Sequence, residues 1–228
     1  NLIQDIIDRQ IEEIKREDFN SGKVIIQYFE MLPDNSEIKI LYNKMLASQT
    51  HEKERLQKQL RLFIIPGKID VNIMTKLDKT NYDPDGNELP SQFSDALSAL
   101  RGYANSRIKS SIIFSAGLNP RLFSYCETFE DFYPDLKGNI NKKIILKVSD
   151  YRSALIQGKY LAKKGLWISE FRIESGINCG GHAFISNGIP LGPILEDFKN
   201  KRNELYNELF IECENALKIL GRNPFIIK

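Results

Sequence analysis

Short apolar runs alternate with helical patterns from residue 61 onward, and this alternation constrains the fold more than any other feature. Four of the runs have strand length and are rich in β-branched or aromatic residues: "RLFIIPGKIDVNIM", "SSIIFSAG", "KKIILKVSD" and "LWISEFRIES". Helix signals lie between them, with Ser94 and Asn119 as expected N-caps and Gly165 as a stop. Strands joined by single helices run parallel with right-handed crossovers, so the sequence predicts an α/β protein with a parallel sheet.

Two architectures contain such a sheet: an open doubly wound sheet and a (β/α)8 TIM barrel of about 250 residues. Five or six strands can be distinguished, which suits an open sheet unless the barrel is incomplete. The sequence closes on "NPFIIK", an apolar run that resembles the beginning of a strand. We therefore expect a (β/α)8 TIM barrel that is incomplete at its C-terminal end.

The first sixty residues have a helical pattern. Their apolar residues recur at intervals of three and four, as in "NLIQDIIDRQIEEIKREDF" and "SEIKILYNKMLASQTHEKERLQKQL", and charges fill the other positions. We expect two domains, a helical N-terminal extension over residues 1–60 and the partial (β/α) barrel over residues 61–228.

Composition excludes several classes of function. Lys and Arg total 32 against 30 Asp and Glu, a near balance that argues against nucleic acid or an anionic membrane as a partner. No apolar run approaches the roughly 18 residues of a membrane span. The three cysteines are far apart and not in CxxC spacing, which indicates reduced thiols in a cytoplasmic protein and offers no metal site. The expected partner is a small-molecule substrate, and the sequence leaves open whether the protein forms a homo-oligomer.

Polar residues gather after the predicted strands, at the end of a parallel sheet where ligands bind. Lys147 stands inside an otherwise apolar strand, where a lysine is costly unless it reaches a partner or a cavity. It either pairs with Glu174 or Asp150, or it faces a bound anion or an electron-rich ring. The other polar residues of these strand ends are Thr75, Lys76, Asp78, Asn119, Ser149, Asn178, Cys179 and His182.

A glycine pair separates Cys179 from His182 in "ESGINCGGHAF". Because Gly180 and Gly181 lack a Cβ, main chain can approach a flat ligand closely and turn its N–H groups toward an oxygen. His182 is either a hydrogen-bonded structural residue or a base whose ordinary pKa suits proton abstraction near neutrality. A thiol nucleophile at Cys179 has little support, since no third group that would orient the histidine is evident.

Taken together, "KIILKVSD" and "RIESGINCGGHAF" resemble the flavin-dependent TIM-barrel oxidoreductases, especially nitronate monooxygenases, and the flavin barrel of glutamate synthase. The resemblance implies FMN as cofactor, His182 as catalytic base and Gly180 and Gly181 as flavin contacts. It also implies that Lys147 lies near the flavin N1 and O2, where it acts in both catalysis and cofactor binding. We assign Asn72 and Lys76 to the cofactor site as well.

Where nitronate monooxygenases have a Glu-Ala pair, this chain has Asn178 and Cys179, with Glu174 four residues upstream of Asn178. These three residues are the candidates for substrate binding. The hypothesis is an FMN-dependent oxidoreductase, similar to nitronate monooxygenase, that stacks a small organic substrate on the flavin. The alternatives are a Schiff-base lyase or aldolase that uses Lys147, and a non-catalytic barrel scaffold. Because no glycine-rich turn follows "PFIIK", we expect FMN binding no tighter than micromolar.

Overall fold

The computed structural model describes residues 1–115, 117–174 and 191–225, and the chain divides into two compact units, residues 1–68 and 69–228. Each unit has its own core of buried hydrophobic side chains.

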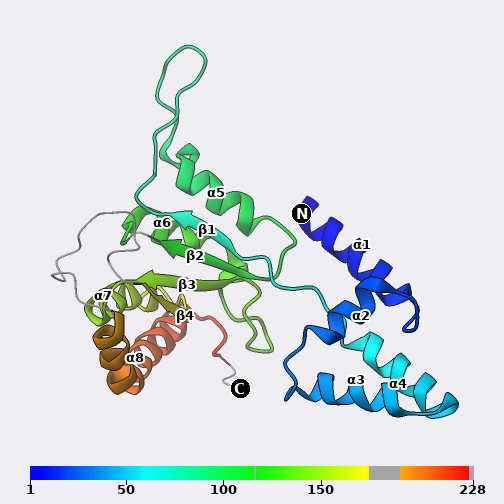
Figure 1. Cartoon of the computed structure of the whole chain (residues 1–228). Helices are drawn as coiled ribbons and strands as arrows, with labels where there is room; N and C mark the ends of the chain where they lie inside the picture. The colour runs from blue at the N-terminus through cyan, green and yellow to red at the C-terminus, as the bar shows by residue number, and fades with distance from the viewer. Residues whose placement is uncertain (116, 175–190, 226–228) are drawn as a thin grey trace. The chain divides into compact units, whose positions relative to one another are not determined.

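The first unit is helical (Figure 1). Its helices are α1 (Leu2–Arg16), α2 (Lys23–Glu30), α3 (Glu37–Ala47) and α4 (Thr50–Leu62). Their apolar sides enclose a core built around Phe29, whose ring stacks on that of Tyr42 with the ring centres 5.2 Å apart. The buried Lys39 ammonium donates to the carbonyl oxygens of Phe29 (3.1 Å) and Glu30 (2.8 Å), and so satisfies the carboxyl end of α2.

The second unit contains a four-stranded parallel sheet, in which the strands follow one another in chain order (Figure 1). The strands are β1 (Val71–Met74), β2 (Ser111–Ser115), β3 (Lys143–Val148) and β4 (Ile168–Ile173). All four lie within the four apolar runs of the sequence, and all three pairings are parallel. The prediction of an α/β protein with a parallel sheet is therefore confirmed, while the described residues contain four strands and not a complete barrel.

Helices follow or connect these strands. They are α5 (Asp95–Ala104), α6 (Pro120–Tyr125), α7 (Tyr151–Ala162) and α8 (Leu191–Ile219), with short 3-10 helices η1 (Ser91–Phe93), η2 (Cys126–Thr128) and η3 (Glu130–Phe132). Asn119 caps α6 as predicted, by accepting from the amide of Leu122 at 3.0 Å. Ser94 stands at the N-cap of α5 without a capping bond from its side chain, and Asp78 accepts from the amide of Ala96 instead (3.2 Å).

The two faces of the sheet differ in chemistry. One face joins the helices in the main core, where residues such as Ile112, Phe114, Ile144 and Leu146 are buried. The side chains that alternate with these point to the opposite side, because successive residues of a strand face opposite ways. We call this second side the polar face. It includes Asn72, Ile113, Ser115, Ile145, Lys147, Glu170 and Arg172, as the strand register shows.

Candidate functional site

The polar face ends, at the carboxyl ends of the strands, in an ion pair between Lys147 and Glu174. Lys147 Nζ lies 2.5 Å from Glu174 Oε1, and the two side chains are 22% and 32% exposed. The backbone fixes both groups, since Lys147 belongs to β3 and the amide of Glu174 donates to the carbonyl of Val148 at 2.9 Å. The lysine that the sequence marks as unusual therefore has a carboxylate partner and lies partly open to solvent.

Arg172 is the second cation of the polar face, and it contacts two acids. Its guanidinium donates to Glu170 Oε1 at 2.7 Å and to Asp70 Oδ2 at 3.1 Å. These hydrogen bonds, first that of Glu170 and then that of Asp70, raise the pKa of Arg172 above its ordinary value. Asp70 precedes β1 and Arg172 belongs to β4, so the contact joins the two outer strands of the sheet.

Other polar residues at the strand ends hold the loops in place. The Thr75 hydroxyl lies within hydrogen-bond distance of the carbonyls of Ser115 (2.8 Å) and Gly117 (2.7 Å), and the Asn119 amide donates to the Thr75 carbonyl at 2.9 Å. Asp150 caps α7 by accepting from the amide of Ser153 at 2.7 Å. These side chains explain how the β1, β2 and β3 loops keep their shape.

The described residues bring together part of the predicted site. Asn72 lies on the polar face with Lys147 and accepts from the Ser115 hydroxyl at 2.8 Å. Lys76 follows β1 and packs beside Gly117, where an added Cβ would lie 3.7 Å from Lys76 Cε. Gly117 has a φ of +103°, a conformation that favours glycine.

Five of the predicted residues lie outside the described part of the chain. They are Asn178, Cys179, Gly180, Gly181 and His182. Their expected roles as base, flavin contacts and substrate ligands stay predictions.

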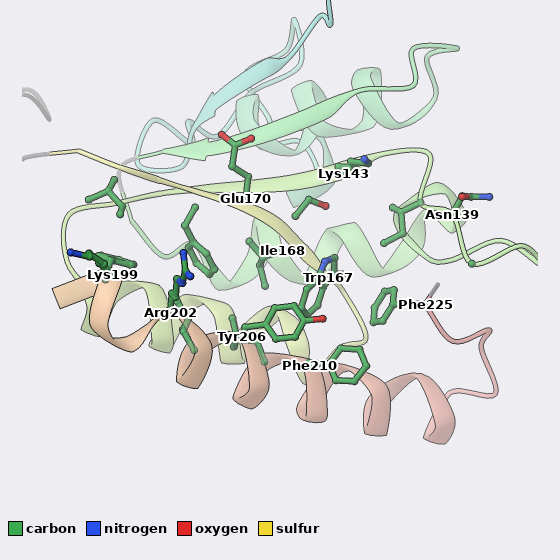
Figure 2. Close-up of a pocket in the computed structure, with 18 of the residues that line it drawn as sticks. Asn139, Lys143, Trp167, Ile168, Glu170, Lys199, Arg202, Tyr206, Phe210 and Phe225 are labelled. Carbon is green, nitrogen blue, oxygen red and sulfur yellow. The ribbon is translucent and has the colours of Figure 1, made fainter. Parts of the chain in front are cut away.

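A groove with a volume of about 880 Å³ runs between the outer strand β4 and α8 (Figure 2). The β4 residues Ile168, Phe171 and Ile173 form one wall. Aromatic side chains line the end near the start of β4, namely Trp167, Tyr206, Phe210 and Phe225.

Sequence reasoning missed this groove, although two signals were available. Tyr206 and Phe210 are four residues apart in α8, so they share a side of the helix, and their rings stack 5.9 Å apart. Trp167 is the only tryptophan of the chain and stands at the start of a strand. What the pattern could not show is that β4 and α8 leave space between them.

Two of the three cysteines belong to the part of the chain that the structure describes. Cys126 and Cys213 are buried and free, and burial raises the pKa of both thiols, that of Cys213 to about 12. A thiol with a raised pKa is a poor nucleophile near neutrality. Within residues 1–115, 117–174 and 191–225, no three His, Cys, Asp or Glu side chains are grouped so as to hold a metal ion. None of the helices in these ranges is long and apolar enough to cross a membrane.

Comparison with known proteins finds no matching family model, no matching curated protein and no matching solved structure. The fold and the described site define the class as a mixed α/β protein with a parallel sheet and a charged group of residues at its carboxyl edge.

Proposed function

We propose that this chain is an FMN-dependent oxidoreductase, similar to the nitronate monooxygenases, with its cofactor site on the polar face at the carboxyl ends of the strands. The observation that carries the proposal is the position of Lys147. Its ammonium projects from the end of β3 and is held in place by Glu174 at 2.5 Å. Ligands of parallel α/β sheets and barrels bind at this end of the strands.

The curvature of the sheet supports a partial barrel around this face. In a flat sheet, β1 and β4 would stand about 14 Å apart, and the register offsets Arg172 from Asp70 by about four residues, or about 13 Å, along the strands. Two extended side chains do not span that diagonal, yet Arg172 Nη2 lies 3.1 Å from Asp70 Oδ2. The sheet therefore bends along this diagonal toward its polar face, as twisted sheets do and as the closure of a barrel also requires.

The described residues fit the ring of FMN. A cation suits the N1 and O2 edge of an isoalloxazine, because negative charge gathers there on reduction, and a side-chain amide such as that of Asn72 suits its polar pyrimidine edge. Lys147 has three N–H donors, and among the described residues Glu174 accepts one of them. FMN, when bound, supplies hydride and single-electron transfer.

In this proposal the residues of the chain bind and orient. Glu174 holds the ammonium of Lys147 against the end of β3, and Lys147 offers a positive charge where negative charge develops. The Ser115 hydroxyl fixes the amide of Asn72 at 2.8 Å, so that this amide presents a defined edge. His182 is the proposed base, and the substrate is a small organic molecule that stacks on the ring.

FMN titration followed by flavin fluorescence tests the proposal, with the absorbance spectrum of the freshly purified protein as a first check. Lys147→Met should weaken FMN binding by at least about tenfold, because it removes a charge-assisted hydrogen bond. Lys143→Met is the matched control, since Lys143 lies at the amino end of the same strand, on the same side. Quenching that is absent even at millimolar flavin, or an equal loss in both variants, would count against the proposal.

The geometry gives less support to the Schiff-base alternative. A lysine nucleophile must be free to attack a carbonyl carbon, whereas Lys147 Nζ is held 2.5 Å from Glu174 Oε1. Borohydride reduction in the presence of a carbonyl substrate should leave Lys147 unlabelled by mass spectrometry. Labelling at this residue would favour the lyase or aldolase.

A further inference from the structure

The groove runs along the outer strand β4, and its β4 residues Ile168, Phe171 and Ile173 face away from the polar face on which we place the flavin. Glu170 and Lys143, which face the polar side, also line the groove. Figure 2 shows Glu170 pointing away from α8, while Trp167 and Ile168 point toward it. With a volume of about 880 Å³, the groove falls in the range of small-molecule sites. Its walls are mostly apolar, and the contributing residues of α8 include Leu195, Phe198, Leu205 and Leu209.

Arg202 gives this apolar groove a positive charge. Figure 2 shows Arg202 rising from α8 toward β4, and the residue is among those that line the groove. Within residues 1–115, 117–174 and 191–225, Arg202 has no ion pair, whereas neighbouring Lys201 pairs with Asp197 at 2.9 Å. Lys199, also at the groove, lies 3.6 Å from Glu196 and is 72% exposed. A guanidinium in such a position is suited to a carboxylate, which it binds through two parallel hydrogen bonds.

The spacing along α8 indicates the shape of the ligand. Arg202, Tyr206 and Phe210 follow one another at intervals of four residues, so they lie along one side of the helix. At 1.5 Å per residue, Tyr206 and Phe210 follow Arg202 by about 6 Å and about 12 Å along the helix axis. Trp167 faces both rings edge-on, at 5.7 Å from Tyr206 and 6.2 Å from Phe210.

We propose that this groove binds an amphipathic carboxylate, whose acid group pairs with Arg202 and whose unbranched apolar chain extends along β4 toward Trp167. Charge complementarity selects the anion, because Arg202 and Lys143 both line the groove and neither has an ion pair within residues 1–115, 117–174 and 191–225. Burial of the chain against Phe171, Leu205 and Phe210 supplies the rest of the binding free energy.

Trp167 provides a direct measurement, because it is the only tryptophan of the chain and lines the groove. Decanoate, titrated into the full chain below its micelle concentration, should change the tryptophan fluorescence saturably. Decanol, which has the same chain without the charge, should bind about tenfold more weakly, as expected for the loss of one charge-assisted contact. Equal affinities for the two probes would overturn the proposal.

A pair of variants isolates the charge. Arg202→Gln should lower decanoate affinity about tenfold and leave decanol affinity unchanged. Lys218→Gln removes one positive charge from the other end of the same helix and should change neither. Both positions are exposed, so the circular dichroism spectra should match that of the wild type. Undiminished decanoate binding by Arg202→Gln would refute the role of Arg202.

The two sites of the molecule can be told apart in the same experiment. FMN and decanoate should bind independently, since the proposed flavin site lies on the polar face. If FMN and decanoate compete, and this competition disappears in Arg202→Gln, flavin occupies the groove. The assignment of the groove to an amphipathic carboxylate would then be wrong. Failure of FMN to bind at all, with decanoate binding intact, would count only against the proposed oxidoreductase.

Discussion

A buried lysine directly before β3 allows a direct test of what stabilises the sheet. Lys142 is only 1% exposed, and its ammonium donates to the carbonyls of Ser106 (2.8 Å) and Ile108 (2.6 Å). It also lies 4.7 Å from the ring centre of Tyr103. A single cation therefore ties the turn before β2 to the start of β3.

Replacing Lys142 with Met keeps the length of the side chain but removes the two hydrogen bonds to carbonyls and a longer one, 3.4 Å, to Ser106 Oγ. Each bond to a charged donor contributes about 1.5–3 kcal/mol, and part of this offsets the cost of burying the ammonium. The net expectation is a fall of about 3 kcal/mol in the free energy of unfolding, or about 6–12 °C in Tm for a unit of this size. Lys143→Met is the control, because that neighbouring side chain is exposed and should change stability by less than about 0.5 kcal/mol.

Urea unfolding followed by Trp167 fluorescence measures the second unit alone, since the first unit has no tryptophan. Burial lowers the pKa of Lys142 below 10.5, and the charge of Asp131 raises it less. Between the two pKa values the unfolded state binds more protons than the native state, so the wild type gains stability as the pH rises toward 10.5. The difference in the free energy of unfolding between the wild type and Lys142→Met should therefore increase from neutral to alkaline pH. Equal stability of the Lys142→Met and Lys143→Met variants at neutral pH would refute the reasoning.

Two further predictions concern α7. Asp150→Ala removes the N-cap of this helix and should lower the free energy of unfolding by about 1 kcal/mol in the same urea assay. Gly158→Val should lower Tm by several degrees in a thermal melt, because even a Cβ at this position would lie 2.8 Å from Leu209 Cδ1 in α8; a melt unchanged from the wild type would contradict this close packing of the two helices.

Element type and order could be predicted from the sequence because they depend on local composition. The runs "SSIIFSAG" and "KKIILKVSD" contain β2 and β3. Asn119 caps α6, as its position directly before Pro120 indicates. The cap of α5 could not be predicted in the same way. Its acceptor is Asp78, which lies 18 residues before Ala96 in the chain, while the local candidate Ser94 makes no capping bond.

Burial of charge was the least predictable feature. The sequence singles out Lys147 as a costly lysine, yet Lys142 is the more deeply buried of the two, because its partners lie 34 and 36 residues away in a turn. The pairing of Lys147 with Glu174 was one of the predicted alternatives. The contact of Arg172 with Asp70 spans 102 residues and depends on the curvature of the sheet, which no local pattern encodes.

A β-bulge decides which side chains of β4 reach each of the two proposed sites. Ile168 pairs with Ile144, but the next pair along is Ile145 with Glu170, so Ser169 is an extra residue. Without the extra residue, strict alternation would set Glu170 beside Leu146 in the core and Phe171 beside Lys147 on the polar face.

The spacing of the apolar residues in "ISEFRI" carries this information. Ile168 and Phe171 are three apart, an odd interval that a regular strand would divide between its two faces. The bulge brings both into the core, and it turns Glu170 and Arg172 to the polar face. One inserted residue therefore separates the charged surface on which we place the flavin from the apolar wall of the groove on which we place the carboxylate.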